Sequence, residues 1–283
     1  SPNHVVSDSK NHHPGIDNSG PFLSMNPFSS RCCQHNHGFG WPYYTENLIY
    51  ATPDNGIAAV LYNACQAEVK VGNGTEVTIK EQTNYPFEET IRFTLTTPEK
   101  VSFPLYLRIP SWCKDASIAV NGQKLGVDLI SGKYAKITRE WSDADEIVLT
   151  VPMTFNYRQW QVNKNSVSVD YGPLSLSLKI DEDYQQKDSR QTAIGDSKWQ
   201  EGADASAWPT YEIYPASPWN YALQLNSPIS VQRKEWPFDN NPFTLTNVPL
   251  EFKAKGRLIP EWKIDEYGLC GVLPYEDAPK ADT

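Results

Sequence analysis

The chain has 283 residues, of which 39% are hydrophobic and 21% charged, and this composition suits a folded globular protein rather than a disordered one. The formal net charge of -9 and the scattered lysines and arginines argue against a nucleic-acid partner, because affinity for a phosphate backbone comes from clustered basic side chains. No run of 18 apolar residues occurs, so we expect no membrane-spanning helix, and no signal-peptide pattern is present.

The first thirty residues contain turn signals without periodicity and predict a loop. Between Trp41 and Tyr50 the apolar residues recur at helical spacing, and Pro42 stands near the first turn, so a short helix is predicted there. The chain begins with Ser1 rather than Met, so we expect a processed or truncated product. Its localisation stays open, with the periplasm and the extracellular space as candidates.

After Gly56 the hydrophobic period changes to two, which is typical of half-buried strands. Residues 67–71 and 76–80 alternate on either side of the turn residues 72–74 and predict a β-hairpin. Further strands are predicted at 57–62, 90–95, 103–110, 117–120, 134–137 and 146–151. So many short strands without a strong helical pattern favour a β-sandwich over βαβ units.

The second half of the chain has the same style with less regular patterns. Residues 167–178 predict a strand, a turn at Gly172-Pro173 and a second strand. The polar and acidic segment from Asp181 to Trp208 predicts a long loop. More strands are expected at 229–233, 250–254 and 269–274. The predicted fold class is therefore mainly β.

The segment Arg31-Cys32-Cys33-Gln34-His35-Asn36-His37 holds the strongest chemical signal in the chain. A thiolate is both a nucleophile and a zinc ligand, so Cys32 and Cys33 could anchor one metal ion together. A closed site with His35 and His37 would crowd four ligands around the ion, and we expect the missing ligands elsewhere. In the alternative interpretation the cysteines are small buried hydrophobes and the histidines are capping or surface residues.

The remaining chemistry of the sequence is sparse. Five cysteines, namely Cys32, Cys33, Cys65, Cys113 and Cys270, are an odd and widely spaced set, so at least one thiol should be free and no disulfide framework is predicted. Nothing marks a pair of glycosidase carboxylates. Zincin, P-loop, dinucleotide and nucleophile-elbow motifs are absent from the sequence.

Several segments together carry a resemblance to a known family. Residues 31–36, 40–44 and 51–62 resemble the end of the catalytic domain in β-L-arabinofuranosidase-like proteins of glycoside hydrolase family 127 (GH127). Four later segments are similar to the β-domains of that family: Leu107 to Trp112, Val120-Asn121-Gly122, Trp141 to Pro152, and Tyr171-Gly172-Pro173-Leu174. The resemblance covers most of residues 31–178.

This resemblance implies an upstream helical (α/α)6 barrel that carries the active site, followed by two β-sandwiches. It implies that Cys32 is the catalytic nucleophile and that Cys32 and Cys33 both bind zinc. The other two zinc ligands, a Glu and a Cys, and the glutamate acid/base would belong to the barrel. The chain departs from the commoner family pattern at Gln34 and His35, where that pattern has two prolines, and this departure bears on the substrate and on metal binding.

We therefore expect residues 1–56 to be the remnant of the barrel, 57–155 the first sandwich and 156–262 the second, with 263–283 returning to complete the first. The expected function is that of the C-terminal portion of a retaining glycoside hydrolase, which acts on a terminal L-arabinofuranoside or a related sugar and is inactive without its barrel. One alternative is a structural pair of β-domains that brace the barrel. Another is a carbohydrate-binding module that uses exposed rings, with the candidates Trp141, Trp160, Trp199, Trp208 and Trp219.

Overall fold

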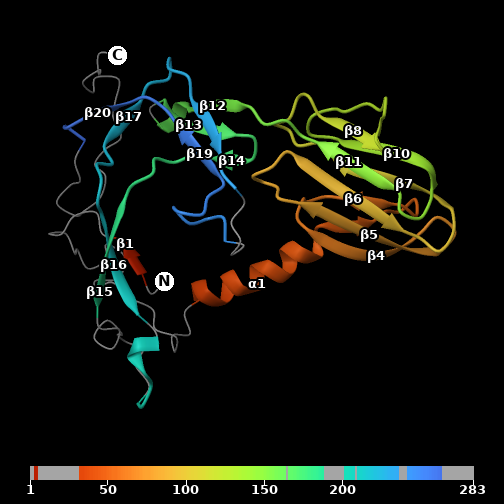
Figure 1. Cartoon of the computed structure of the whole chain (residues 1–283), viewed down its shortest axis with the longest axis horizontal. Coiled ribbons are helices and arrows are strands. Elements are labelled where there is room, and N and C mark those ends of the chain that lie inside the picture. The colour runs from red at the N-terminus through yellow and green to blue at the C-terminus, as the bar shows by residue number, and fades with distance from the viewer. Residues whose placement is uncertain are drawn as a thin grey trace. The chain divides into compact units, whose positions relative to one another are not determined.

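The computed structural model describes residues 3–5, 32–163, 165–187, 201–207, 209–235 and 241–262. The chain divides into two compact units. The first comprises residues 1–38, 160–166 and 177–283, and the second comprises residues 39–159 and 167–176. The prediction of a mainly β protein is confirmed, because strands account for most of the regular structure in these ranges (Figure 1). Within them, no helix has the length and apolar character needed to cross a membrane.

The α-helix α1 (Cys32–Glu46) differs from the predicted helix at both ends. It begins well before Trp41, and residues that were expected in its last turn form the strand β2 (Ile49–Ala51). The early start was missed because residues 36–46 are exposed on every side, which leaves no apolar stripe to read. At the C-terminal end, Thr45 Oγ1 and Asn47 Nδ2 donate to the carbonyls of Trp41 and Tyr43, so these last-turn groups are satisfied.

The second unit contains two large sheets (Figure 1). The four-stranded sheet has the order β10-β7-β3-β2, with β3 (Ile57–Ala59), β7 (Val101–Arg108) and β10 (Tyr134–Trp141), and its β3–β7 pair is parallel. The six-stranded sheet has the order β4-β5-β6-β11-β8-β9 and is antiparallel, with β4 (Cys65–Val71), β5 (Thr75–Thr83), β6 (Thr90–Thr96), β8 (Ser117–Val120), β9 (Gln123–Lys124) and β11 (Glu146–Thr150).

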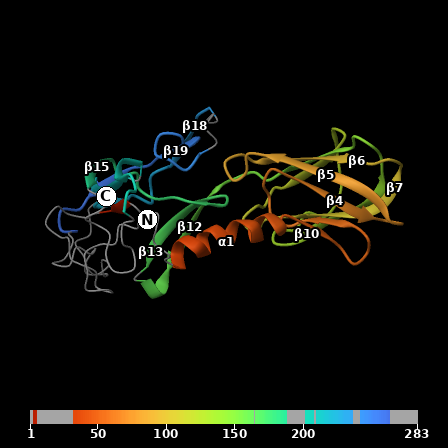
Figure 2. The same cartoon turned by 90° about the horizontal axis from the view of Figure 1, so that it is seen from below.

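These two sheets stack face to face on one hydrophobic core, as Figure 2 shows with β5 and β6 in one layer and β10 in the other. Leu105 and Ile137 from the four-stranded sheet and Ile79 and Phe93 from the six-stranded sheet are all buried in it. The alternation along each strand produces this arrangement, because every second side chain points to the same face. The unit is therefore a β-sandwich.

The six-stranded sheet contains the predicted hairpin and a second hairpin that follows the predicted strand 117–120. The β4–β5 hairpin pairs Val71 with Thr75 across its turn. The second joins β8 to β9 through Asn121 and Gly122, whose φ angles of 49° and 77° are both positive. Such a turn requires two residues that tolerate left-handed backbone, and Asn-Gly is the preferred pair. The sequence signal and the backbone geometry therefore agree.

A small three-stranded sheet follows, with the order β12-β13-β14. Its strands are β12 (Phe155–Trp160), β13 (Ser166–Tyr171) and β14 (Leu174–Ser175), and the 3-10 helix η1 (Gln161–Asn163) lies between the first two. The predicted turn at 172–173 is confirmed, since Gly172 has a φ of 55° there. Arg158 pairs with Asp170 at 2.8 Å and ties β12 to β13.

The described part of the first unit forms small sheets. One sheet has three strands in the order β1-β16-β15, with β1 (Asn3–Val5), β15 (Glu182–Lys187) and β16 (Thr210–Pro215), and the 3-10 helix η2 (Ala205–Ala207) precedes β16. Two further sheets have two strands each: β17 (Tyr221–Leu223) pairs with β20 (Gly256–Leu258), and β18 (Ser230–Arg233) pairs with β19 (Leu250–Lys253). The loops predicted for the first thirty residues and for Asp181 to Trp208 were wrong at β1 and β15, which are strands. Their pairing to β16 outweighs the weak local sequence pattern. The expected strand at 269–274 and the returning segment 263–283 lie outside the described residues.

Candidate functional site

Cys32 and Cys33 occupy the first two positions of α1. The first turn of a helix carries partial positive charge from its unpaired N–H groups, and this charge favours a thiolate there. The side chains of Cys32, Cys33 and His35 lie outside the described part of the structure, so the predicted zinc site stays a prediction. Among the side chains that are described, no three of His, Cys, Asp and Glu gather closely enough to hold a metal ion.

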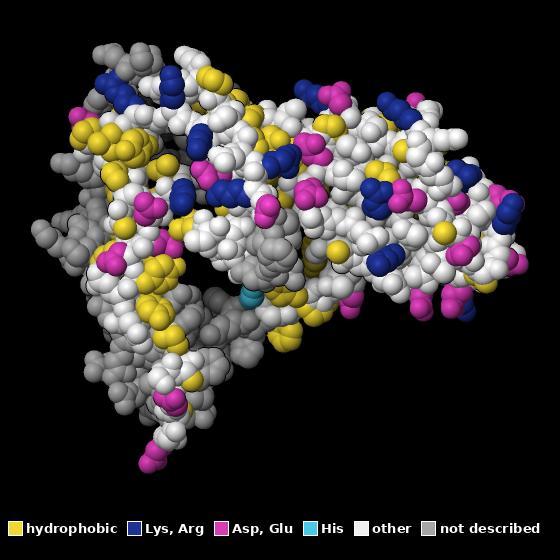
Figure 3. All heavy atoms as spheres, in the orientation of Figure 1, with side chains coloured by type: hydrophobic (Ala, Val, Ile, Leu, Met, Phe, Trp, Pro, Cys, Tyr) yellow, Lys and Arg dark blue, Asp and Glu magenta, His cyan; other side chains and the backbone are white. Residues whose placement is uncertain are grey.

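The rest of α1 presents large apolar side chains to its surroundings. Phe39, Trp41 and Tyr43 are 62%, 59% and 67% exposed. Figure 3 shows hydrophobic side chains gathered along this helix, whereas lysines, arginines, aspartates and glutamates mix over the visible face of the sandwich. A single exposed aromatic ring is common on protein surfaces, but three exposed rings along one helix form an apolar surface. Such a surface suits packing against a further partner.

The two cysteines with described side chains do not offer a nucleophile. Cys65 and Cys113 are free thiols. Partial burial, and then the neighbouring Glu81, raise the pKa of the Cys65 thiol to about 11. Burial likewise raises the pKa of the Cys113 thiol. Both groups are therefore protonated at neutral pH, and a protonated thiol is neither a strong nucleophile nor a good metal ligand.

A buried carboxyl group lies beside Cys65. Glu81 of β5 is 1% exposed, and its Oε1 atom has no hydrogen-bond partner. Burial raises the pKa of this carboxyl to about 8, against the opposing backbone hydrogen bond from Asn63 and the contact with Cys65. Sequence reasoning missed this residue, although the alternation Val77, Ile79, Glu81 along β5 places it on the inward face.

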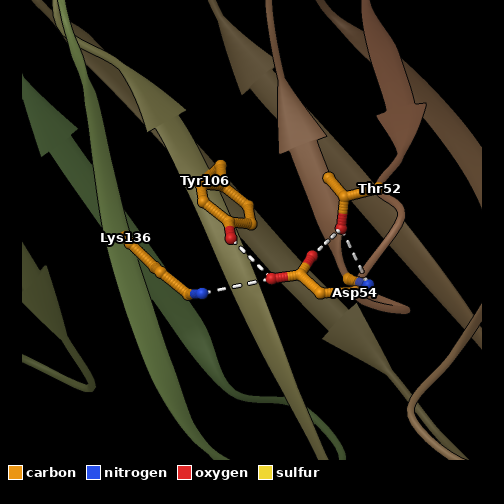
Figure 4. A network of polar contacts seen from close by, with 5 residues as sticks. Thr52, Asp54, Tyr106 and Lys136 are labelled. Atoms are coloured by element: carbon orange, nitrogen blue, oxygen red, sulfur yellow. Dashed lines mark hydrogen bonds and ion pairs between the residues drawn. The ribbon is translucent and has the colours of Figure 1, made fainter.

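An exposed polar network lies on the outer side of the four-stranded sheet (Figure 4). Asp54, in the turn between β2 and β3, accepts hydrogen bonds from Thr52 Oγ1 at 2.5 Å, Tyr106 OH at 2.6 Å and Lys136 Nζ at 3.1 Å. The backbone N–H of Gly56 donates to Thr52 Oγ1 and fixes the turn. The Thr52 and Tyr106 hydrogen bonds hold the pKa of Asp54 well below its usual value. The network therefore fixes one carboxylate and one ammonium group in place.

Next to this network, the loop before β10 and the first residues of β10 line a shallow pocket of about 410 Å³ that is open to solvent. Asp128, Ile130 and Lys133 line it from the loop, and Tyr134 and Lys136 line it from the strand. Lys136 therefore belongs to both the pocket and the Asp54 network. Sequence reasoning did not single out these residues, because they come from a segment without a recognised motif.

The predicted sugar-binding tryptophans have different outcomes. Trp141 is 0% exposed, and its Nε1 donates to the Phe103 carbonyl at 3.0 Å inside the sandwich core, so the expectation of an exposed ring was wrong there. The inward position of Trp141 at the end of β10 explains this outcome. Trp160 is exposed and Trp219 is half-buried. Trp199 and Trp208 lie outside the described residues.

Comparison with known proteins confirms the resemblance over the sandwich. Residues 56–153 match the family described as β-L-arabinofuranosidase, GH127 middle domain. No curated protein sequence is significantly similar to the chain.

Seventeen chains of solved structures are similar to this chain, and three of them are glycoside hydrolases with the following values. One is a glycoside hydrolase with 26% identity and a TM-score of 0.50, over 57% of this chain and 28% of that one. The second is a GH127 β-L-arabinofuranosidase from Geobacillus stearothermophilus T6, with 20% identity and a TM-score of 0.49 over 80% of this chain and 34% of that one. The third is a GH127 β-arabinofuranosidase, with 22% identity and a TM-score of 0.44 over 59% and 32%. The chain thus spans about a third of the length of these proteins.

Proposed function

Since residues 56–153 match the GH127 middle domain, we propose that the chain is the C-terminal portion of a retaining glycoside hydrolase that acts on a terminal L-arabinofuranoside or a related sugar. The family match is the observation that carries this proposal. The chain spans about a third of the similar structures, so the activity belongs to the intact protein. We expect the isolated chain to be inactive.

In this proposal residues 1–56 are the last piece of an (α/α)6 barrel. The exposed rings of Phe39, Trp41 and Tyr43 support it, because packing α1 against upstream helices would bury them and each ring would contribute about 1.5–3 kcal/mol. The first sandwich, residues 57–155, and a second one over 156–262 would brace the barrel. Residues 263–283 would return to complete the first sandwich.

Cys32 is the nucleophile in the intact protein. Its sulfur attacks the anomeric carbon and forms a C–S bond while the C–O bond to the leaving group breaks, and a barrel glutamate gives its proton to the leaving oxygen. The same glutamate then deprotonates a water molecule, which attacks that carbon and releases the Cys32 thiolate. Two inversions give net retention. The place of Cys32 in the first turn of α1 supports this role, because the partial positive charge at a helix N-terminus lowers the pKa of a thiol there.

The residues present fit half of a zinc site. Cys32 and Cys33 are adjacent thiols, and zinc takes thiolate ligands in a tetrahedral set of four. A bound zinc ion would keep both sulfurs ionised at neutral pH. A Glu and a Cys of the barrel would supply the other two ligands.

The test is activity of the intact protein with Cys32→Ser, using Cys65→Ser as the matched control. We expect hydrolysis of a terminal L-arabinofuranoside to fall on the order of 10³-fold or more in the first variant and to stay unchanged in the second. Zinc content measured by mass spectrometry should fall in Cys33→Ser. Full turnover by the Cys32→Ser protein would end the proposal.

A further inference from the structure

The pocket before β10 offers two apolar surfaces to a ligand. Tyr134 is 45% exposed and Ile130 is 59% exposed, and both line the pocket. Tyr134 points outward because its neighbour Ala135 points into the core. An aromatic ring with an aliphatic side chain nearby suits a sugar ring. The C–H face of the sugar can pack flat on the aromatic ring, while the hydroxyl groups at the edge of the sugar remain free for polar contacts.

Around these surfaces the charges balance. Lys133, Lys136 and Asp128 line the pocket, and Asp54 binds the Lys136 ammonium. The two positive and two negative charges therefore cancel. A site with no net charge that still offers ammonium donors and carboxylate acceptors suits a neutral ligand rich in hydroxyl groups, because each hydroxyl can donate and accept.

Lys136 is ordered before any ligand arrives. Its Nζ lies 3.1 Å from Asp54 Oδ2 and 5.1 Å from the centre of the Tyr106 ring (Figure 4). Tyr106 lies directly opposite Lys136 in the sheet register, and its hydroxyl donates to the same Asp54 oxygen. A donor that is already fixed loses less conformational entropy on binding than a free lysine does.

From these observations we propose that this pocket binds one neutral sugar residue of a glycan chain, with Tyr134 as the stacking platform and Lys136, Lys133 and Asp128 as the hydrogen-bonding groups. The volume of about 410 Å³ lies within the usual range for small-molecule sites. The site would hold a glycan chain on the sandwich, and its residues include none of those proposed for the reaction at Cys32. It therefore does not depend on the proposed hydrolase activity.

The test is a titration of the 283-residue chain with arabinohexaose, xylohexaose, cellohexaose and oligogalacturonate, by calorimetry and ligand-observed NMR. At least one neutral oligosaccharide should bind with a dissociation constant on the order of 1 mM or tighter. Tyr134→Ala should weaken that binding about tenfold or more, and Tyr134→Phe should retain it, since the ring remains. Tyr157→Ala is the matched control, because Tyr157 is 43% exposed on the separate strand β12.

Each result decides the proposal. Weaker binding by Lys136→Met together with Tyr134→Ala supports it, provided that circular dichroism shows both variants folded. It is overturned if no neutral oligosaccharide binds, if Tyr134→Ala binds as the unmodified chain does, or if oligogalacturonate binds more tightly than every neutral probe. Binding by Cys32→Ser at unchanged affinity separates this site from the proposed nucleophile, so failure of one hypothesis is distinguishable from failure of the other.

Discussion

Glu81 faces Cys65 across the paired strands β5 and β4, with the Cys65 Sγ atom 3.9 Å from Glu81 Oε2. The thiol is a weak donor and the Oε1 atom has no hydrogen-bond partner. An ionised carboxylate in this position would be poorly solvated, so the protonated acid is the stable form and its pKa rises to about 8. The sandwich therefore holds a neutral acid at physiological pH.

The stability of the chain should depend on pH through Glu81. Its pKa is about 8 in the folded state against 4.5 for the ordinary group, so the folded state binds the proton more tightly. The resulting stability is fully present below pH 4.5 and is lost as the pH rises to about 8. We expect the free energy of unfolding to fall on the order of 3 kcal/mol between pH 5 and pH 8, as measured by urea titration at several pH values.

The variant Glu81→Gln removes the titrating carboxyl group and should flatten the pH dependence of the free energy of unfolding. Glu68→Gln is the matched control, because Glu68 is an exposed residue on the adjacent strand β4. The control should keep the slope of the unmodified chain. If Glu81→Gln shows the same decline between pH 5 and pH 8, then Glu81 is not the group responsible.

A second expectation concerns thiol reactivity. At pH 8 a thiol with a pKa of about 11 is ionised about a hundredfold less than one with the ordinary value of 9.0. Cys65 in the folded chain should therefore react with iodoacetamide about a hundredfold more slowly than in the urea-unfolded chain. Mass spectrometry of the labelled peptides gives both rates. Equal rates in the two states would show that burial does not suppress this thiol.

The sequence predicted the features that depend on local pattern. The β4–β5 hairpin and the β8–β9 turn follow from alternation and from Asn121-Gly122, and both are present. The full length of α1 was not predictable in this way, because residues 36–46 are exposed and form no apolar stripe. Two glycines, Gly38 and Gly40, also weaken the helical signal.

The Asp54 network could not be predicted, because its members meet only after the sheet forms. Tyr106 and Lys136 lie 52 and 82 residues from Asp54 along the chain. They converge because β10 pairs with β7 in the register that places Lys136 opposite Tyr106. The buried role of Trp141 is similar, since the Phe103 carbonyl that accepts its N–H comes from the neighbouring strand. Local composition shows neither contact.

Trp141 should contribute strongly to stability. Replacing it with Phe removes the hydrogen bond to the Phe103 carbonyl and leaves a cavity in the core, so we expect a loss of about 2–4 kcal/mol in the free energy of unfolding. Trp41→Phe is the same chemical change on the exposed surface of α1 and should cost less than about 0.5 kcal/mol in the isolated chain. Equal losses in urea titrations would contradict the buried role of Trp141.

Gly56 should tolerate no side chain. A Cβ atom there would lie 2.2 Å from the Pro104 carbonyl oxygen, which is part of the backbone of β7 and has little room to move. The Gly56 carbonyl accepts a hydrogen bond from the Thr52 N–H, and the Gly56 N–H donates to Thr52 Oγ1, whose hydroxyl donates to Asp54. Gly56→Ala should therefore destabilise the sandwich by at least about 2 kcal/mol, because the β2–β3 turn must shift away from β7.

The control for this substitution is Gly126→Ala, since a Cβ at Gly126 meets no atom within 4 Å. The free energy of unfolding of that variant should lie within about 1 kcal/mol of the value for the unmodified chain. A small increase in stability is expected because alanine restricts the unfolded backbone more than glycine does. Urea titration of the two variants compares the same chemical change in a closed and an open environment. A Gly56→Ala chain as stable as Gly126→Ala would mean that the turn and β7 are not held at this close approach.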